Sequence, residues 1–535
     1  MLREAGLGEA AHLPLMALFG LILGTFMGVL DGTIVNVALP RMMAVFNATT
    51  SQIQWVLTVY LLVGGMVIPA TGYLGDRFGY KRMYLFCIGL FTLSSMLCGL
   101  AWNVNSLIVA RALQAIGGGM VIPLSMAIVY QIWPREKIGL AMSLWGVTMT
   151  LAPAIGPTLG GYLVDNFSWR LIFYINLPVG LLTVLVSAFF LTETEQIADR
   201  KLDVLGLLLS SVSCFLLLLA LDKGQDWGWS AQSTVTLLVA AFFGFLLFFF
   251  WELSVPEPVI DVRLLRNGIF SLALVTSSLV SVALFLGVFL TPLFTQQVQG
   301  YSPTQTGLIL MPAALASGLM MPLAGKLFDR VGAALPGILG LALISLTTYT
   351  LRHVTVDMPV QYLQLLLSVR GLGLGLAMMP LMTAGMNAVP PRFTGQASAL
   401  MNVIRQVAAS FGISLVTYVF ENRMVFHGER LAEGVSHLAP LGYFYYSQVA
   451  GKVGALLGLA AARPATEGLL QGAIQKQAAT LAVGDAFLVA TVIALMALPL
   501  AFVFTKGRID LARQAAAAEL GDRDGGGPPA MVTEV

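Results

Sequence analysis

The stretch Gly72-Tyr73-Leu74-Gly75-Asp76-Arg77-Phe78-Gly79-Tyr80-Lys81-Arg82 lies between two apolar runs, each long enough to cross a membrane. Its charges and glycines predict a turn between two spans. Residues 325–332, Gly-Lys-Leu-Phe-Asp-Arg-Val-Gly, repeat the spacing Gly-x-Leu-x-Asp-Arg-x-Gly between two further apolar runs. The chain is therefore predicted to be a duplicated membrane unit, an organisation that suggests transport.

The composition indicates a polytopic membrane protein. Of 535 residues, 57% are hydrophobic and 10% are charged, and the mean hydropathy is +0.84, whereas a soluble domain carries about 25% charged residues. The first apolar run, residues 15–39, is too long for a signal-peptide core of about 7–15 residues, so we expect it to remain as the first span. The net charge of +2 gives no indication of a nucleic-acid partner.

Apolar runs of about 20 residues predict fourteen spans. They lie at 15–39, 53–74, 82–101, 106–131, 137–163, 169–191, 203–221, 233–253, 269–295, 305–326, 333–351, 359–384, 395–420 and 482–504. Short cytoplasmic loops are rich in Lys and Arg. With the amino terminus inside, the short outer loops hold only Arg41, Arg170, Lys223 and Arg352. Both termini are therefore predicted to be cytoplasmic.

The repeated turn follows the second span of each half, so the second half is predicted to begin near Asn267. The predicted fold class is all-α, with two pseudo-symmetric six-helix bundles and two inserted transmembrane helices. The predicted regions are a cytoplasmic amino terminus (1–14), the first bundle (15–191), the inserted pair (203–253), the second bundle (269–504) and a cytoplasmic tail (505–535) that is disordered toward its end. The second bundle includes a long outer loop, 421–481, predicted as a partly helical, amphipathic cover at the membrane surface or as a docking element for another protein.

No residue pattern indicates a cofactor or a metal. Cys87, Cys98 and Cys214 all fall inside apolar runs, so no structural disulfide is expected. The four histidines are scattered without metal-ligand spacing, and the chain contains no Gly-x-x-x-x-Gly-Lys-[Ser/Thr] stretch that would bind ATP. We expect a proton gradient, rather than a cofactor, to supply the energy.

Asp31 is the only carboxylate deep inside a span of the first half. Burial disfavours the charged form of an isolated carboxylate, so Asp31 is a candidate to load and release a proton. Counting about 1.5 Å per residue from the outer helix ends, Asp31 lies ~12 Å deep and Arg111 ~8 Å deep. We favour a proton-linked pair of these two residues over a fixed structural salt bridge. Gln114, one turn after Arg111, could hydrogen-bond in the same polar patch.

Five stretches together resemble the fourteen-span drug:proton antiporters of the major facilitator superfamily. They are residues 30–40 (Leu-Asp-Gly-Thr-Ile-Val-Asn-Val-Ala-Leu-Pro), 72–82, 111–119 (Arg-Ala-Leu-Gln-Ala-Ile-Gly-Gly-Gly), 156–161 (Gly-Pro-Thr-Leu-Gly-Gly), and Trp169-Arg170 with Asn176-Leu177-Pro178. Tyr80 departs from the family pattern, in which a basic residue is frequent. The resemblance implies two bundles that rock around a midplane cavity. In a two-membrane bacterium it also implies a periplasmic adaptor, a membrane fusion protein, and an outer-membrane channel as partners.

The candidate conformational residues belong to the repeated turn and the fifth span. Gly156 and Gly160 form a small-residue stripe that lets another helix approach, while Pro153 and Pro157 kink the span. The resemblance implies that this bend seals the outer side. The full set is Gly72, Asp76, Arg77, Gly79, Arg82, Gly156, Pro157, Gly160, Gly161, Asp329 and Arg330. For Arg77 the alternative is a simple positive-inside anchor, and for Arg82 we prefer that alternative.

Arg370 and Arg405 are deep cations of the second half, each roughly 15–17 Å from its helix start and without a carboxylate at that depth. They either hydrogen-bond to backbone carbonyls or form a cavity wall that suits neutral or anionic lipophilic compounds better than dications. Met and aromatic side chains could line an adaptable cavity, although such residues are more often core or lipid contacts. The cavity candidates are Asn36, Trp55, Tyr60, Gln114, Arg370, Met378 and Arg405.

The predicted function is proton-coupled export of hydrophobic small molecules, including drugs, across the bacterial cytoplasmic (inner) membrane by alternating access. The alternative within transport is export of a specific endogenous lipid or metabolite. An integral-membrane enzyme would need a cluster of His, Asp or Ser at one membrane face, and no such cluster occurs in the sequence. A sensor or scaffold would have little reason to keep Asp31 and Arg111 in its spans.

Overall fold

The computed structural model describes residues 5–193, 202–434, 440–457 and 459–524. Within these ranges the chain is helical apart from its connecting turns and one isolated bridge between Gly332 and Thr505. Fourteen helical segments of the described chain are long and apolar enough to cross a membrane. This confirms the predicted all-α fold class and the number of spans. The end of the tail, for which disorder is predicted, lies outside the described residues.

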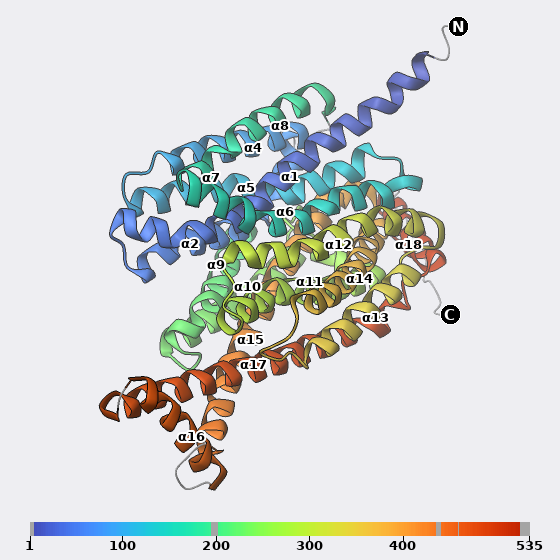
Figure 1. The fold of residues 1–535 in the computed structure, drawn as a ribbon. Helices are drawn as coiled ribbons and strands as arrows, with labels where there is room; N and C mark the ends of the chain where they lie inside the picture. Colours follow the sequence, from blue (N-terminus) through green and yellow to red (C-terminus); the bar gives the residue numbers. More distant parts are fainter. Residues whose placement is uncertain (1–4, 194–201, 435–439, 458, 525–535) are drawn as a thin grey trace.

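The first six spans form one bundle, coloured blue to teal in Figure 1. Its helices are α1 (Ala5–Phe46), α2 (Thr50–Val67), α3 (Ala70–Phe78), α4 (Tyr80–Gly99), α5 (Val104–Ile132), η1 (Arg135–Lys137), α6 (Ile138–Asn166), α7 (Leu171–Tyr174) and α8 (Asn176–Phe190). Within it, α1 packs against α6 and α8, and α5 packs against α2 and α4. The sixth span is made of α7 and α8 together.

The last six spans form the second bundle, coloured yellow-green to red in Figure 1. Its elements are η2 (Val262–Arg266), α11 (Gly268–Leu293), the π-helical η3 (Phe294–Val298), α12 (Pro303–Val331), α13 (Ala334–Leu351), α14 (Val360–Asn387), η4 (Pro391–Phe393), α15 (Thr394–Gly434), α16 (Pro440–Leu457), α17 (Leu459–Ala501) and α18 (Lys506–Asp524). Helix α14 packs against α11, α12 and α13, and α17 packs against α11, α13 and α15.

The inserted pair consists of α9 (Val204–Trp227) and α10 (Gln232–Ser254), which pack against each other. Helix α9 also contacts α2 of the first bundle and α15 of the second. Many large apolar side chains of α10 are exposed, among them Phe242, Phe243 and Leu247. The pair is therefore attached to the two bundles through α9, while α10 offers its apolar face to lipid.

The repeated turn is more helical than the sequence predicts. Residues 70–78 form α3 and α4 begins at Tyr80, so the chain reverses at a single residue, Gly79, whose φ is +91°. Only glycine adopts this backbone conformation without strain. The break before α3 lies at Pro69, which has no backbone N–H to continue the hydrogen-bonding pattern of α2. We call the end of the molecule that carries residues 72–82 the motif end.

The region predicted as a partly helical outer loop, 421–481, is largely helical in its described part. Helix α15 continues past the apolar segment to Gly434, α16 follows, and α17 starts at Leu459. These extensions project from the body at the opposite end, the end that carries α16 (Figure 1). Hydropathy marks only the apolar length of a helix, whereas Ala, Leu, Glu and Arg also favour helix outside the bilayer, which explains the difference.

Three of the helices that begin at the opposite end carry local start signals. Helices α2, α5 and α12 each begin with a capping box, at Thr49, Asn103 and Ser302 respectively. In each box the capping side chain accepts a hydrogen bond from the backbone N–H of the third helical residue, and the side chain of that residue accepts one from the backbone N–H of the capping residue. Both bonds satisfy amides that would otherwise be free. Helix α1 begins and α18 lies at the motif end (Figure 1), as an even number of spans requires.

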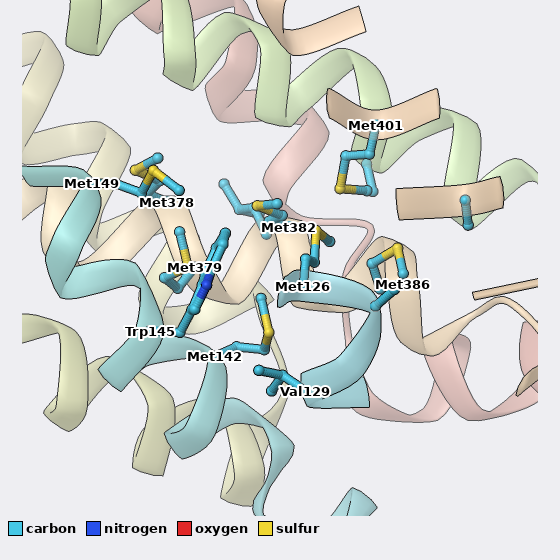
Figure 2. Packing of buried hydrophobic residues seen from close by; sticks show 14 of the residues in the cluster. Met126, Val129, Met142, Trp145, Met149, Met378, Met379, Met382, Met386 and Met401 are labelled. Atoms are coloured by element: carbon cyan, nitrogen blue, oxygen red, sulfur yellow. The ribbon is translucent and has the colours of Figure 1, made fainter. Parts of the chain in front are cut away.

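The two bundles meet along α6 and α12, and also where α3 and α5 pack against α15 at the motif end. Between the bundles lies a buried cluster rich in methionine (Figure 2). Its labelled members come from α5, α6, α14 and α15: Met126, Val129, Met142, Trp145, Met149, Met378, Met379, Met382, Met386 and Met401. The Trp145 indole donates to Thr25 and Ser125 at 3.0 Å, which fixes its ring in the cluster. Methionine repacks easily, so this contact between bundles is apolar and adaptable.

Candidate functional site

A buried polar network joins α1, α5 and α8. The Asp31 carboxylate is fully buried and receives Nη1 of Arg111 at 2.5 Å, Nε2 of Gln114 at 3.0 Å and Nδ2 of Asn176 at 3.0 Å. Arg111 also donates to Oε1 of Gln114 at 2.8 Å. Ion pairs that survive in an apolar interior need good geometry and further hydrogen bonds, and this pair has both.

The Arg111 guanidinium is held on several sides. Its Nε donates to the Val56 carbonyl at 3.3 Å, and its central carbon lies 4.0 Å from the centroid of the Tyr60 ring. Phe173 lies farther off, with its ring centroid at 5.8 Å. A guanidinium over an aromatic face gains from the ring quadrupole, more so where water is excluded. Arg111 is therefore bound by groups from α1, α2 and α5.

Asn176 is a site residue that sequence reasoning did not select. It follows α7 at the first position of α8, and its amide donates to both Asp31 and Oγ of Ser95, each at 3.0 Å. Ser95 in turn donates to the Phe173 carbonyl at 2.9 Å. The available signal was the Asn176-Leu177-Pro178 motif, which sequence analysis used only for family resemblance. An asparagine in an apolar run at the depth of Asp31 points to the same network.

A cavity of about 570 Å³ lies between the two bundles. The first bundle lines it with α1, α2, α5 and α6, and the second lines it with α11, α12, α14 and α15. Helix α9 contributes Asp222, which accepts a hydrogen bond from Thr58 of α2 at 2.9 Å. The volume is in the range of small-molecule sites, and the walls are mostly apolar with a few polar groups.

The structure sorts the predicted cavity residues into three groups. Asn36, Tyr60, Met378, Arg370 and Arg405 line the cavity, as does Arg111. Gln114 is not in the lining, because its side chain is fully buried against Asp31. Trp55 is also outside the lining. The face of α2 that reaches the cavity carries Leu57, Thr58 and Leu61, whereas the Trp55 ring lies 5.8 Å from Nζ of Lys223 on α9.

Arg370 and Arg405 occupy the second-bundle wall of the cavity. Arg370 is 6% exposed and donates through Nη2 to the Ala283 carbonyl of α11, while its Nε has no hydrogen-bond partner. Arg405 is half-buried and donates through Nη2 to Oδ1 of Asn402 at 2.8 Å. In the described part of the chain, neither arginine contacts a carboxylate.

The two copies of the repeated turn both contact the other bundle. At the end of α12, Asp329 accepts the backbone N–H groups of Gly139 at 2.8 Å and Leu140 at 3.2 Å. These amides belong to the first turn of α6, where helices leave donors free, so Asp329 caps a helix of the opposite bundle. A Cβ placed on Gly72 of α3 would lie 3.0 Å from the backbone of Gly395 and Gln396 at the start of α15.

Asp76, Arg77 and Arg82 each have a partner within the first half. Asp76 accepts a hydrogen bond from the Tyr80 hydroxyl at 2.7 Å, and Arg77 donates to the Tyr73 hydroxyl at 2.5 Å. Arg82 is an exposed side chain 3.5 Å from Glu193, an interaction of little energetic weight. Arg330 is exposed. Tyr80, the departure from the family pattern, thus donates a hydrogen bond to Asp76.

The glycines of α6 allow close approach on two sides. A Cβ on Gly156 would lie 2.3 Å from Oγ1 of Thr33, and one on Gly160 would lie 2.8 Å from Ile34, so both face α1. Gly161 faces Oγ1 of Thr304 on α12, across the boundary between bundles. Pro153 and Pro157 lie inside α6. The stripe therefore serves packing within the first bundle, and Gly161 serves the contact with the second.

The described residues contain no group of three or more His, Cys, Asp or Glu that could hold a metal ion. Cys87, Cys98 and Cys214 are free and buried.

Comparison with known proteins agrees with this architecture. The Major Facilitator Superfamily model matches residues 21–413. The multidrug export protein EmrB of Haemophilus influenzae is 35% identical over 433 residues, which are 80% of this chain and 85% of that protein. The multidrug resistance protein Stp of Mycobacterium tuberculosis is 35% identical over 406 residues, 75% of each chain.

A solved structure of the proton:xylose symporter XylE aligns with a TM-score of 0.57 over 94% of this chain and 99% of that one. At 14% identity this likeness concerns the fold alone. Two six-helix bundles, a cavity between them and a family match over most of the spans lead to one conclusion. The chain belongs to the major facilitator superfamily and is a membrane transporter rather than an enzyme.

Proposed function

We propose that this transporter is a proton-coupled exporter of hydrophobic small molecules. The observation that carries the proposal is the position of Asp31, buried directly behind Arg111, which itself lines the cavity between the bundles. The names of the relatives EmrB and Stp support multidrug export as the activity. The energy source is the proton gradient, and no cofactor takes part.

In this proposal Arg111 links the proton site to the substrate site. When Asp31 is ionised, its carboxylate holds the guanidinium through Nη1. Protonation removes that charge and releases Arg111, and we propose that protonation of Asp31 and occupancy of the cavity by substrate compete or alternate. A proton on Asp31 and a substrate in the cavity therefore change the same side chain, which couples their occupancy and gives exchange.

Alternating access is proposed to occur by rocking of the two bundles. In the present state the motif end is closed by the Asp329 cap, by the contacts of α3 and α5 with α15, and by the methionine cluster. Substrate entry from that end requires these contacts to separate. The Asp329 cap is polar and the methionine side chains repack easily, which favours such a separation.

The proposed location is the bacterial cytoplasmic membrane, with both termini and the motif end facing the cytoplasm. The excess of Lys and Arg in the loops at that end supports this orientation. In a two-membrane bacterium, we propose a periplasmic adaptor and an outer-membrane channel as partners. The helical extensions of α15 and α17 with α16 would then lie on the periplasmic side.

The proposal is tested with everted vesicles under an imposed pH gradient, comparing the wild type with Asp31→Asn. Asparagine keeps an acceptor for Gln114 but carries no ionisable proton, so gradient-driven dye or weak-acid transport is expected to fall about 10-fold or more. Binding of the substrate to the purified variant should persist.

The matched control is Asp165→Asn, which neutralises an exposed carboxylate near the end of α6. It is expected to transport like the wild type. Unchanged gradient-driven transport in Asp31→Asn would contradict proton coupling at this residue.

A further inference from the structure

The cavity lining carries more positive than negative side chains. It contains three arginines, Arg111, Arg370 and Arg405, and one carboxylate, Asp222. Arg111 is neutralised by Asp31 from behind the wall. Asp222 is itself engaged, since it accepts a bond from Thr58 and lies 3.7 Å from Nζ of Lys223. Two positive charges of the second bundle therefore remain without an anionic partner in the described chain.

Arg370 is the stronger of the two sites. A guanidinium has five N–H donors, but in the described structure Arg370 has a single acceptor, the Ala283 carbonyl, and its Nε is unpartnered and buried. An arginine that served only to clamp α14 to α11 would be expected to satisfy more of its donors, because buried polar groups are costly when left unpaired. Arg370 lines the cavity, so the guanidinium N–H groups that the Ala283 carbonyl leaves unpaired are the candidates to bind a ligand there.

Gly287 makes the space that the Arg370 guanidinium occupies. A Cβ at this position would lie 1.9 Å from Nη1 and 2.3 Å from the central guanidinium carbon. Gly287 itself lines the cavity on α11. Because Gly287 has no side chain, the Arg370 guanidinium can lie close to the α11 backbone where it reaches the cavity. The position of this positive charge therefore depends on a neighbouring residue that carries no charge itself.

Apolar side chains surround this charge. Leu284, Phe285 and Val288 of α11 and Leu374 and Met378 of α14 line the same wall. An apolar surface excludes water and strengthens an electrostatic interaction with the guanidinium. The wall therefore suits a molecule with one negative group and a substantial apolar body.

We propose that the substrates of this transporter are lipophilic organic anions with a single carboxylate, and that Arg370 binds the carboxylate. Arg405, held by Asn402 on the same wall, adds a second positive charge to the site. The carboxylate accepts two N–H groups from the guanidinium, the geometry that arginine favours. The inference rests on the proposed function only in treating the cavity as the substrate site.

The first test compares three fluorescent ligands that share one apolar body: pyrenebutyrate, its neutral amide, and the pyrenebutyl trimethylammonium cation. Binding is measured by fluorescence on the purified full-length protein in detergent, without a gradient. The carboxylate is expected to bind about 10-fold or more tightly than the amide, because a charge-assisted hydrogen bond replaces a neutral one. The cation should bind most weakly. Equal binding of carboxylate and amide, or tightest binding of the cation, would overturn the inference.

The second test uses two variants that act on the same charge in different ways. Arg370→Gln removes it, and Gly287→Ala keeps it but displaces the guanidinium. Both should reduce the preference for carboxylate over amide by about 10-fold or more. Affinity for the amide should change little.

The controls are Arg352→Gln, at an exposed arginine after α13, and Gly89→Ala, where an added Cβ has no atom within 4 Å. Both should keep the wild-type preference. If Arg370→Gln does not fold, Gly287→Ala decides alone. A carboxylate preference that survives displacement of the guanidinium would assign the anion site elsewhere and refute the role of Arg370.

Proton coupling at Asp31 and anion binding at Arg370 can be refuted independently of each other. Loss of gradient-driven transport in Asp31→Asn concerns proton coupling, whereas the ligand preference is measured without any gradient. If the transporter exported cations in exchange for protons, that result would contradict the anion site but not proton coupling. If it preferred the carboxylate but transported without a gradient, that result would contradict proton coupling but not the anion site.

Discussion

At the scale of single residues, the carboxylate of Asp31 is held by groups from two other helices. Arg111 and Gln114 reach it from α5, and Asn176 reaches it from α8. These groups all donate, so they stabilise the ionised carboxylate and would each lose part of that interaction when it is protonated. The charge state of one side chain is thereby linked to the relative position of three helices.

We predict that Asn176→Ala impairs transport without abolishing substrate binding. The substitution removes one of the donors to Asp31 and leaves Ser95 without the amide. A lost hydrogen bond to a buried charged group costs about 1.5–3 kcal/mol, so gradient-driven transport in vesicles should fall by about 10-fold or more.

The control is Asn166→Ala, because Asn166 is exposed and bonds only to the Tyr162 carbonyl of its own helix. Equal transport by the wild type, Asn166→Ala and Asn176→Ala would show that Asn176 has only a packing role.

At the scale of elements, α6 and α12 touch through glycine backbones at the motif end. A Cβ on Gly325 would lie 2.4 Å from the Gly139 carbonyl, and one on Gly139 would lie 2.7 Å from the Gly325 carbonyl. The same approach lets Asp329 reach the free amides of the first turn of α6. Small residues therefore allow both the contact between the bundles and the cap across it.

We predict opposite stability effects for two glycine-to-alanine substitutions. Gly325→Ala forces α12 away from the α6 backbone and should destabilise the present state by about 1–3 kcal/mol. Gly89→Ala places its methyl in open space on α4 and should raise stability by up to about 1 kcal/mol, because alanine favours helix. Thermal unfolding of the purified variants measures both. A melting temperature for Gly325→Ala at or above that of Gly89→Ala would show that the α6–α12 contact accommodates the added methyl group without strain.

The inserted pair reaches the cavity through α9. Asp222 bonds to Thr58 of α2, and the Leu221 carbonyl accepts the Ser414 hydroxyl of α15 at 2.8 Å. Gln225 contacts Glu421 on the same side. Helix α9 thus bridges the two bundles where α2 and α15 flank the cavity, and any rocking motion has to break at least one of these contacts.

At the scale of the whole molecule, the two bundles are joined along α6 and α12, between α3, α5 and α15 at the motif end, and through α9 on the side of α2 and α15. If protons enter from the opposite end and leave at the motif end, the protonated transporter must be the form that opens the motif end. Neutral Asp31 should therefore favour that opening.

We predict that Asp31→Asn, which mimics the protonated residue, lowers the hydrogen-exchange protection of Gly139 and Leu140. These amides are capped by Asp329 only while the motif end is closed. Exchange measured by mass spectrometry on peptides that include the start of α6 should be faster than in the wild type. Asp165→Asn should leave it unchanged. Slower exchange in Asp31→Asn would reverse the proposed direction of coupling.

The amino-acid sequence by itself determined the number of spans, the duplicated organisation and the few ionisable residues inside the membrane. Length and hydropathy are local properties, and a span needs about 20 apolar residues wherever it packs. Charges at depth are costly, so Asp31, Arg111, Arg370 and Arg405 stand out without any knowledge of contacts. The same local signals miss helix that continues beyond the bilayer, as in α15 and α17.

Only the tertiary structure decided which of these groups meet and which face the cavity. Asn176 is 145 residues from Asp31, and Gln114 turned out to face Asp31 while Trp55 faces α9. The amides that Asp329 caps and the space beside Arg370 likewise depend on distant backbone segments. The physical reason is that the rotation of a helix about its axis, and its distance from its neighbours, are set by close packing with other helices. The sequence of one span does not contain that information.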